Sequence, residues 1–444
     1  MTNSSFTSIT PHYLVLSKDG LVATFMQDNG DTTCYARQVR LGVPQGAVTS
    51  PLLFNFYLCH LPRPPENSNI LIVQYADDIS IFITGGNNIK EMGLVLTNYA
   101  KEVTSFFEER GLLISPEKSS VTYFSPDTKD HKKEADVKLN GIQVPTDKHP
   151  KILGLTLDPM YKFGPHIDKV VSSGKSKLNA LKALAGTDWG QEKEMLTTAY
   201  KATLRSNIEY AIAIWGPIIS GNHWNRIQTL QNHALRIATG CVKMSSIDHL
   251  HQETQVLPLK EHSEMLTKQF LTNFQHPEHP GNTDILQEQD QNARSKKKTL
   301  LEHRGTVDAL FNRADMPNDI NKKIKRCKKH LHTETVKKVL SSYQANRVLE
   351  AKPPKIHTNE SSLSRKSRVK LAQYRSGFVP DLFSYKHRID NSIPDSCPSC
   401  GQSPHDVKHV FNCPEKPTNL QLIDLWKKPV KIAEFLDLDR PPDD

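Results

Sequence analysis

Alternating apolar and polar positions are the main signal in the first 90 residues. The stretch ATFMQDNGDTTCYARQV (residues 23–39) has two alternating runs around Asn29-Gly30, a strong signal for a β-hairpin. Farther along, the extended runs ILIVQY (70–75) and ISIFIT (79–84) are separated by Ala76, Asp77 and Asp78. This pattern predicts a second hairpin that carries the two aspartates at its tip.

A helical period replaces the alternation between residues 87 and 111. Apolar side chains recur there at steps of four and three, at Met92, Leu96, Tyr99, Val103 and Phe106. A glycine follows at position 111, where it would close the helix in a left-handed conformation. We therefore expect an amphipathic helix whose apolar stripe faces the core. The run KILGLTLD (151–158) predicts a further strand, so strands and helices are interleaved as in an α+β domain.

The second half of the chain is mostly helical and becomes increasingly polar. Ile227, Leu230, Ala234 and Ile237 mark one clear helix, which Gly240 ends. Beyond about Phe274 the chain is rich in lysine, as in SKKK (295–298) and KKIKRCKKHLH (322–332). The stretch AKPPKIHTNESSLSRKS (351–367) is typical of a linker.

Composition narrows the class of protein only modestly. The 444 residues carry a formal net charge of +9 and a pI near 9.0, which is compatible with a phosphate-rich partner but does not demonstrate one. The sequence contains no run of about 18 apolar residues and no signal-peptide pattern at its N-terminus, so we expect no membrane partner. We expect an intracellular protein, in the nucleus or the cytoplasm.

The adjacent carboxylates Asp77 and Asp78 raise a question of charge. Two neighbouring negative charges repel each other, and Mg²⁺ bound by their hard oxygens would offset that repulsion. In nucleotidyl transfer, two such ions flank the reacting phosphorus, one at the attacking 3′-hydroxyl and one at the leaving pyrophosphate. Taken alone, the pair favours a solvated turn over a metal site, because aspartate is a common turn residue.

A glycine-bracketed loop lies upstream of this pair. The segment RLGVPQGAVTSPLLFNFYLCHLP (40–62) places Gly42 and Gly46 on either side of Val43, Pro44 and Gln45, and then becomes apolar and helix-like. The glycines permit close approach of the backbone to a ligand, and the amide of Gln45 can hydrogen-bond a nucleotide or a template base. An ordinary structural turn is the alternative interpretation.

The cysteines indicate a metal site rather than a disulfide framework. Seven is an odd number, and three of the cysteines fall within the last 50 residues. Cys397, Cys400, His409 and Cys413 have the spacing C-x₂-C-x₈-H-x₃-C. Three thiolates and one imidazole would complete a closed tetrahedral Zn²⁺ site, which is typical of structural zinc. His405 is a competing ligand.

Together, these segments closely resemble the reverse transcriptases of non-LTR (LINE-type, jockey/R1-like) retrotransposons. Gly42 to Gly46 matches the family's substrate-positioning segment, and Tyr75-Ala76-Asp77-Asp78 matches its catalytic box. The run GLLISPEKSS (111–120) resembles the next motif, and HPKILGLTLD (149–158) is similar to the primer-grip hairpin. The segments IEYAIAIWGP (208–217) and RIQTLQNHALRIATG (226–240) resemble the thumb region. The resemblance covers most of the chain and is weakest between about 275 and 360.

The resemblance implies roles for individual residues. Asp77 would be a Mg²⁺ ligand, Asp78 would support the same site, and Tyr75 would lie beside the primer end. Lys118 would place a positive charge near the leaving phosphate. The expected contacts to the incoming deoxynucleotide and the template are Gly42, Pro44, Gln45 and Gly46. The implied partners are an RNA template, a DNA primer and deoxynucleotides.

One feature departs from the family pattern. The family carries a further catalytic aspartate on an earlier strand, farther upstream than the 41 residues that precede Gly42 here. Asp19, Asp28 and Asp31 have the local sequence of turns instead. We therefore expect an N-terminally truncated product in which the fingers and the first metal ligand are missing and autonomous activity is impaired. The alternative is a non-catalytic nucleic-acid-binding relic.

The expected fold is α+β, with a partial polymerase palm of antiparallel sheet and helices, a helical thumb and a small C-terminal zinc knuckle. The corresponding ranges are residues 1–160, 161–275 and 371–444, joined by a basic polar linker region at 276–370. The basic run Arg365, Lys366, Arg368 and Lys370 would either grip nucleic acid or form a solvated linker. The lysine cluster at 322–332 has the same two interpretations, with a nuclear-import signal as a third.

Overall fold

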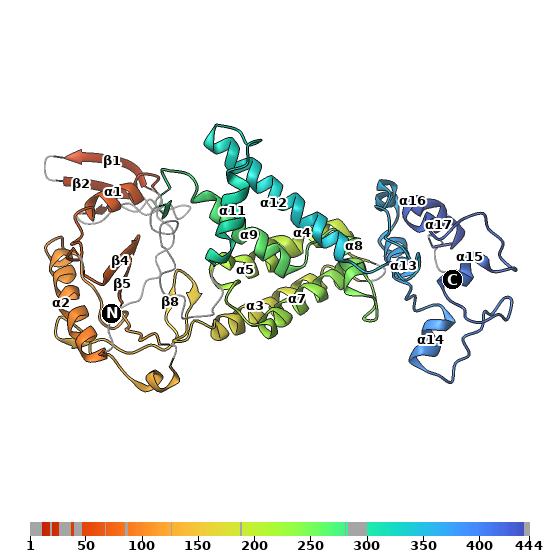
Figure 1. Cartoon of the computed structure of the whole chain (residues 1–444), viewed down its shortest axis with the longest axis horizontal. Helices are drawn as coiled ribbons and strands as arrows, with labels where there is room; N and C mark the ends of the chain where they lie inside the picture. Colours follow the sequence, from red (N-terminus) through yellow and green to blue (C-terminus); the bar gives the residue numbers. More distant parts are fainter. Residues whose placement is uncertain are drawn as a thin grey trace. The chain divides into compact units, whose positions relative to one another are not determined.

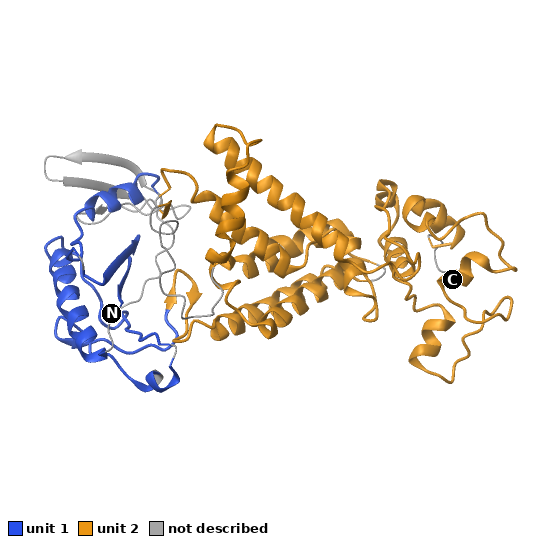
Figure 2. Cartoon of the chain, viewed as in Figure 1, with its two compact units in different colours: residues 1–150 blue, residues 151–444 orange. Residues whose placement is uncertain are grey.

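The computed structural model describes residues 11–17, 20–25, 37–39, 47–66, 68–84, 88–125, 127–186, 189–279, 281–282 and 300–438, with the backbone alone before residue 47. The chain forms two compact units, residues 1–150 and 151–444 (Figures 1 and 2). Within the described residues, every helix is too short or too polar to span a membrane.

The first sheet of the N-terminal unit is antiparallel and has the order β1-β2-β3. It consists of β1 (Pro11–Ser17), β2 (Gly20–Phe25) and β3 (Arg37–Val39). Ala23 pairs with Val39 and Phe25 pairs with Arg37. The antiparallel pairing expected for residues 23–39 is therefore confirmed. The predicted turn at Asn29-Gly30 and the three aspartates Asp19, Asp28 and Asp31 lie outside the described residues.

A second hairpin and a long helix form the core of the N-terminal unit. Strands β4 (Ile70–Tyr75) and β5 (Asp78–Ile83) pair antiparallel, and α2 (Ile89–Glu108) supplies buried Tyr99, Val103, Phe106 and Phe107. Alternate residues of the hairpin, Ile70, Ile72, Ile79 and Ile81, pack on these side chains, as period-2 patterning requires. Both elements match the sequence predictions.

Gly111 closes the end of helix α2, as the sequence predicted. Gly111 has a φ of 67°, and Leu112 N–H donates to the carbonyl of Phe107 while Gly111 N–H donates to that of Glu108. These are the two hydrogen bonds of a Schellman motif, which requires a left-handed residue that glycine adopts without steric cost.

The remaining described elements of this unit are small. They are α1 (Ser50–Tyr57), the 3₁₀-helix η1 (Thr128–Lys132) and the short hairpin β6 (Lys138–Leu139) and β7 (Ile142–Gln143). A second apolar cluster of Val121, Ala135, Val137 and Val144 covers one end of α2 through Ile89 and Leu96.

The C-terminal unit begins with a hairpin where we predicted one strand. The run 151–158 forms β8 (Lys151–Ile152) and β9 (Leu155–Thr156), which pair antiparallel. Leu153 and Gly154 take positive φ values of 46° and 85°, the pattern of a type I′ turn, so the chain reverses in the middle of the run. The single strand predicted from the apolar run is therefore wrong, because the run contains its own turn. The hairpin that the resemblance implied for residues 149–158 is present.

Helices build the rest of the C-terminal unit. In chain order the first are α3 (Gly164–Lys182), α4 (Lys193–Tyr200), the π-helix η2 (Lys201–Arg205), α5 (Ser206–Glu209), α6 (Ile212–Trp215), α7 (Gly221–Thr239), α8 (Ile247–Thr254) and α9 (Leu259–Asn273). Helix α7 is central, because it packs against α3, α4, α8 and α9.

The predicted stripe of α7 forms much of this core. Ile227, Leu230 and Ala234 are buried, and Gly240 ends the helix with a φ of 68°. A methyl group at Gly174 of α3 would lie 2.7 Å from a methyl carbon of Leu230. The close approach of α3 to α7 therefore depends on the absence of a side chain at Gly174.

Two packed helices occupy much of the predicted linker region 276–370. Helices α11 (Arg304–Phe311) and α12 (Ile320–Ser342) both pack against α9. The short 3₁₀-helix η3 (Leu300–His303) precedes them. Leu310, Phe311, Cys327 and Leu331 form a buried cluster. The linker prediction is wrong for these residues because apolar positions spaced by four, at 327 and 331, are hidden among many lysines.

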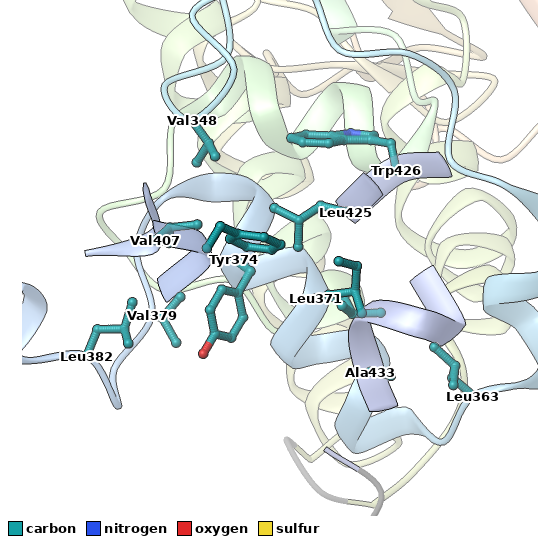
Figure 3. Close-up of a cluster of buried hydrophobic side chains, with 12 residues drawn as sticks. Val348, Leu363, Leu371, Tyr374, Val379, Leu382, Val407, Leu425, Trp426 and Ala433 are labelled. Atoms are coloured by element: carbon teal, nitrogen blue, oxygen red, sulfur yellow. The ribbon is translucent and has the colours of Figure 1, made fainter. Parts of the chain in front are cut away.

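The C-terminal module has its own apolar core (Figure 3). It includes η4 (Thr358–Ser362), α13 (Arg365–Ser376), α14 (Phe383–Ile389), α15 (Val407–Asn412), α16 (Asp424–Lys427) and α17 (Pro429–Phe435). Leu371 and Tyr374 of α13 pack with Leu425 and Trp426. Val348 and Leu363 belong to the same core, so this module begins before the predicted boundary at residue 371.

Candidate active site and candidate metal centre

The tip of the β4–β5 hairpin presents the two aspartates. Tyr75 pairs with Asp78, and Ala76 and Asp77 form the two-residue loop between them. Ala76 has a φ of 52°, and its carbonyl accepts a 3.1 Å hydrogen bond from the side-chain amide of Gln74. A left-handed residue other than glycine is uncommon and is enriched at functional sites.

Solvent surrounds the predicted catalytic groups of this hairpin. Asp77 and Asp78 are exposed, and 64% of the Tyr75 surface is accessible. The strands beneath are held by the apolar cluster on α2, in which the Tyr99 hydroxyl also donates to the carbonyl of Pro62 at 2.6 Å. A packed scaffold thus presents two exposed carboxylates to solvent, an arrangement that suits a ligand that arrives from solution.

The two carboxylates are compatible with Mg²⁺. This ion usually retains several waters and is held by one or two carboxylates together with substrate phosphates. Among the described residues, no third histidine, cysteine or carboxylate joins Asp77 and Asp78 in a metal-holding group. The hairpin can therefore supply part of a coordination shell, and phosphates of a bound nucleotide would complete it.

The other predicted substrate contacts are less fully described. Gly42, Pro44, Gln45 and Gly46 lie outside the described residues. Lys118 lies in an exposed turn at residues 116–118. In the described structure, no hydrogen bond or ion pair joins Lys118 to the hairpin, so its role beside the leaving phosphate stays a prediction.

The C-terminal Cys/His cluster is assembled as its spacing predicted. The donor atoms of Cys397, Cys400, His409 and Cys413 all lie within 4.8 Å of one another. Cys397 Sγ and Cys413 Sγ are 4.0 Å apart, and Cys400 Sγ and His409 Nε2 are 3.3 Å apart. For Zn–S bonds of 2.3 Å, the edge of a tetrahedron is about 3.8 Å, so shifts of about 1 Å or less would bring this set onto one zinc ion.

Local structure explains how distant donors converge. A tight turn, in which Gly401 N–H donates to the carbonyl of Cys397, joins the first two cysteines. His409 lies on α15, whose first turn is capped by the side chain of Asp406. His405, the competing ligand, instead accepts a hydrogen bond through Nδ1 from Phe383 N–H and lies outside the donor group.

The electrostatics of the cluster favour a thiolate. Burial alone would raise the pKa of Cys397, but hydrogen bonds from backbone groups of Cys400 and Ser399, and from the side chain of His409, lower it to about 6. The thiolate is the form that binds metal, and a lowered pKa makes it available at neutral pH.

The basic run of α13 has a different role from either one predicted. Arg365 is buried and donates to the carbonyls of Ala238 and Ile237 at 2.6 and 2.9 Å, at the C-terminal end of α7. Arg368 is also buried and pairs with Glu192 at 2.6 Å and with Glu194. Both arginines are therefore neither free for nucleic acid nor part of a solvated linker, because neighbouring helices supply their acceptors.

The other two basic residues of this run are less buried. Lys366 is half-buried, and Lys370 pairs with Asp381.

A buried charge network joins α13 to the preceding helices, and the sequence analysis missed it. Arg375 contacts Glu253 and Glu360, each at 2.6 Å, and Lys193 contacts the same two carboxylates at 3.0 and 3.1 Å. Burial opposes ionisation of Glu253, but Arg375 and Lys193 hold its pKa well below the usual range. The partners come from distant parts of the chain, so no local pattern announces them.

A comparison with known protein families gives a match for the part of the chain that contains the hairpin. Residues 4–157 match the family described as reverse transcriptase (RNA-dependent DNA polymerase). This part of the chain is therefore similar to a reverse transcriptase domain, and the matched range contains the Asp77-Asp78 hairpin and its supporting helix.

The chain is also similar to individual proteins of transposable elements. The chain is 28% identical over 261 residues to a probable RNA-directed DNA polymerase from transposon BS of Drosophila melanogaster, covering 56% of this chain and 28% of the relative. It is 24% identical over 247 residues to the RNA-directed DNA polymerase from mobile element jockey of the same species, covering 54% of this chain and 26% of the relative.

A third relative is the retrovirus-related Pol polyprotein from type-1 retrotransposable element R1 of Nasonia vitripennis. It is 23% identical over 182 residues, covering 39% of this chain and 52% of the relative. The chain is thus similar, over part of its length, to RNA-directed DNA polymerases of transposable elements. It spans about a quarter of the length of the Drosophila relatives.

Proposed function

We propose that this chain is a polymerase segment of a non-LTR retrotransposon protein that extends a DNA primer with deoxynucleotides on an RNA template. The observation that carries the proposal is the Asp77-Asp78 pair, exposed at the tip of a rigid hairpin inside the range that matches the reverse transcriptase family. Both carboxylates are exposed, so the phosphates of a nucleotide could reach them from solvent.

The proposed roles follow from position and charge. Asp77 and Asp78 hold Mg²⁺, which when bound supplies positive charge to the reacting phosphate and its neighbouring oxygens. Tyr75 directs its exposed ring beside the primer end, and Lys118 offers a positive charge to the leaving phosphate. The loop that contains Gly42, Pro44, Gln45 and Gly46 positions the nucleotide through close backbone approach and a side-chain amide.

Primer extension tests this proposal. The wild-type chain, given an RNA template, a DNA primer, deoxynucleotides and Mg²⁺, is expected to extend the primer. Asp77→Asn should reduce the rate by about 1,000-fold, since the carboxylate charge that holds the metal is worth several kcal/mol. Asp136→Asn is a matched control, because Asp136 is an exposed aspartate of the same unit outside the hairpin.

The outcomes separate the polymerase from its rival. Equal extension by wild type and Asp77→Asn would refute the assignment of the hairpin. A wild-type chain that binds primer–template but never extends it would instead favour the non-catalytic nucleic-acid-binding relic. The observation that keeps this second candidate open is that the described residues supply only two carboxylates.

We also propose that Cys397, Cys400, His409 and Cys413 hold one structural Zn²⁺. Four protein donors close a tetrahedron and leave no position for substrate, so bound zinc would tie the turn at residues 397–401 to α15. Purified protein should contain about one zinc per chain by elemental analysis. Cys400→Ser should lose most of it, whereas Cys59→Ser, which changes an exposed cysteine outside the cluster, should retain it.

A further inference from the structure

Helix α12 holds a large share of the positive charge of the chain. Its 23 residues contain eight lysines and arginines and one glutamate, which gives +7, against +9 for all 444 residues. Six of the eight cations lie between residues 322 and 329, in the N-terminal half of the helix. Such a concentration requires a physical explanation.

Stability of the helix does not provide that explanation. The N-terminal end of a helix carries a partial positive charge, so Lys322 and Lys323 in the first turn are electrostatically unfavourable. Like charges three and four positions apart, such as Lys322 with Lys325 and Lys325 with Lys329, repel each other as well. Each repulsive pair lowers the stability of the helix by a few tenths of a kcal/mol. The lysines therefore must serve a purpose other than helix stability.

Packing determines which side of α12 faces solvent. Cys327 and Leu331 are buried against Leu310 and Phe311 of α11, and the side chain of Gln269 on α9 donates to the carbonyl of Lys328 at 3.0 Å. At 100° per residue, the side chains at positions 322, 325 and 329 project within about 60° of one another, on the opposite side of the helix. All three are exposed.

These three lysines, the basic ridge, differ from their basic neighbours. Lys323 lies 4.2 Å from the ring centre of Phe311, Arg326 pairs with Asp315 at 3.3 Å, and Lys337 pairs with Glu334 at 3.2 Å. Within the described part of the chain, no ion pair or hydrogen bond engages the ammonium group of Lys322, Lys325 or Lys329. The ridge therefore offers a row of uncommitted ammonium groups, about one helical turn apart, to an external anion.

We propose that the basic ridge of α12 binds the phosphate backbone of a nucleic-acid duplex. Ammonium groups act as point charges toward phosphate and carry no base specificity. Helix α12 contains no phenylalanine, tyrosine or tryptophan, so it lacks the stacking surface typical of single-strand binding. The choice of nucleic acid as partner rests on the proposed function, for which an RNA–DNA hybrid is the natural duplex.

A pair of double variants on the same helix tests the ridge. Lys325→Gln/Lys329→Gln removes two charges from it, and Lys337→Gln/Lys338→Gln removes two exposed charges from the other end of α12. Binding of a blunt RNA–DNA hybrid is measured by fluorescence anisotropy across a salt series, without Mg²⁺ or nucleotides. A single-stranded DNA of the same length serves as the second probe.

The expected result is a change in both affinity and salt dependence for the ridge variant. Loss of two phosphate contacts should make the slope of log K against log salt shallower by about 1.8, which is about a 60-fold loss of affinity at 0.1 M salt. The control variant should change affinity by about twofold or less, since screening limits the reach of charges away from the contact. Single-strand binding should be much less affected.

Three results would overturn the proposal. They are an unchanged slope for the ridge variant, an equal loss in the control variant, and an equal loss for single strand and hybrid. Misfolding is excluded if thermal unfolding shows the ridge variant to be as stable as wild type. The binding assay contains no Mg²⁺ or nucleotides, so failure of the polymerase assignment, seen in primer extension, and failure of the ridge, seen in hybrid binding, give different patterns.

Discussion

Two basic segments of this chain have similar composition and opposite structural roles. Residues 322–329 of α12 place their free lysines in solvent, whereas Arg365, Arg368 and Arg375 of α13 are buried among carboxylates and helix carbonyls. From the sequence, we expected each segment either to contact nucleic acid or to form a solvated linker. Only the first segment has a surface that can meet a partner.

The kind of cation distinguishes the two segments. The ridge on α12 is made of lysine, and the buried basic residues of α13 are all arginine. A guanidinium is weakly hydrated and presents several donors in a plane, so it can be buried against two carboxylates at once, whereas an ammonium group is strongly hydrated.

The strongest test of this contrast is Arg375→Met. It leaves buried Glu253 with Lys193, and buried Glu360 with Lys193 and the more distant Arg368 at 4.0 Å. Loss of one partner of a buried ion network typically costs about 3–5 kcal/mol. Denaturant unfolding would measure the change. Lys329→Met on the ridge is the control, expected to stay within about 0.5 kcal/mol. A loss below 1 kcal/mol for Arg375→Met would show that the network contributes little.

Arg365→Gln should have the next largest effect. The guanidinium satisfies two carbonyls at the end of α7, and buried hydrogen bonds to a charged group are worth about 1.5–3 kcal/mol. The free energy of unfolding should fall by about 2 kcal/mol. The neighbouring Lys366→Gln, at a half-buried position, should change it by less than about 0.5 kcal/mol, and similar losses in both variants would contradict the assigned role.

His249 adds a pH dependence to the buried interface. Burial lowers its pKa to about 4, and its Nε2 atom lies 3.1 Å from the carbonyl of Ala372 on α13. The unfolded chain takes up a proton below pH 6.5 and the folded chain only near pH 4, so stability is full above pH 6.5 and is lost as the pH falls. Linkage gives a loss of about 2 kcal/mol between pH 8 and pH 5.

Unfolding free energies measured from pH 8 to pH 5 would check this expectation. His249→Gln should flatten that part of the profile, while exposed His332→Gln should leave it unchanged. A profile with the same slope in His249→Gln and in wild type would assign the pH dependence to other groups.

The smallest expected effect has the opposite sign. Lys322→Gln/Lys325→Gln removes repulsion and an unfavourable charge at the start of α12, so thermal unfolding should show an increase in stability of about 0.3–1 kcal/mol. A variant that is more stable but binds an RNA–DNA hybrid more weakly would show that these lysines act in binding. The buried arginines of α13, in contrast, stabilise the fold. A destabilised variant would mean that these lysines have a structural contact after all.

Short-range patterns predicted the elements whose causes are local. The hairpin at Asp77 and Asp78 follows from alternation on both sides of a two-residue loop, and α2 follows from its apolar period and from Gly111. The Cys/His group converges because its spacing fits one turn and one short helix. In each case the interacting residues are within about 20 positions of one another.

Tertiary structure alone decided the features whose partners are far apart in the chain. Arg375 meets Glu253 from 122 positions away, and Arg365 meets Ala238 from 127 positions away, so nothing near either arginine indicates its burial. Periodicity and spacing act over one or two turns of chain, and they determined the strands, the helices and the candidate metal ligands. Whether a charged side chain faces solvent or an opposite charge depends on packing between distant helices, and only the folded structure specifies that.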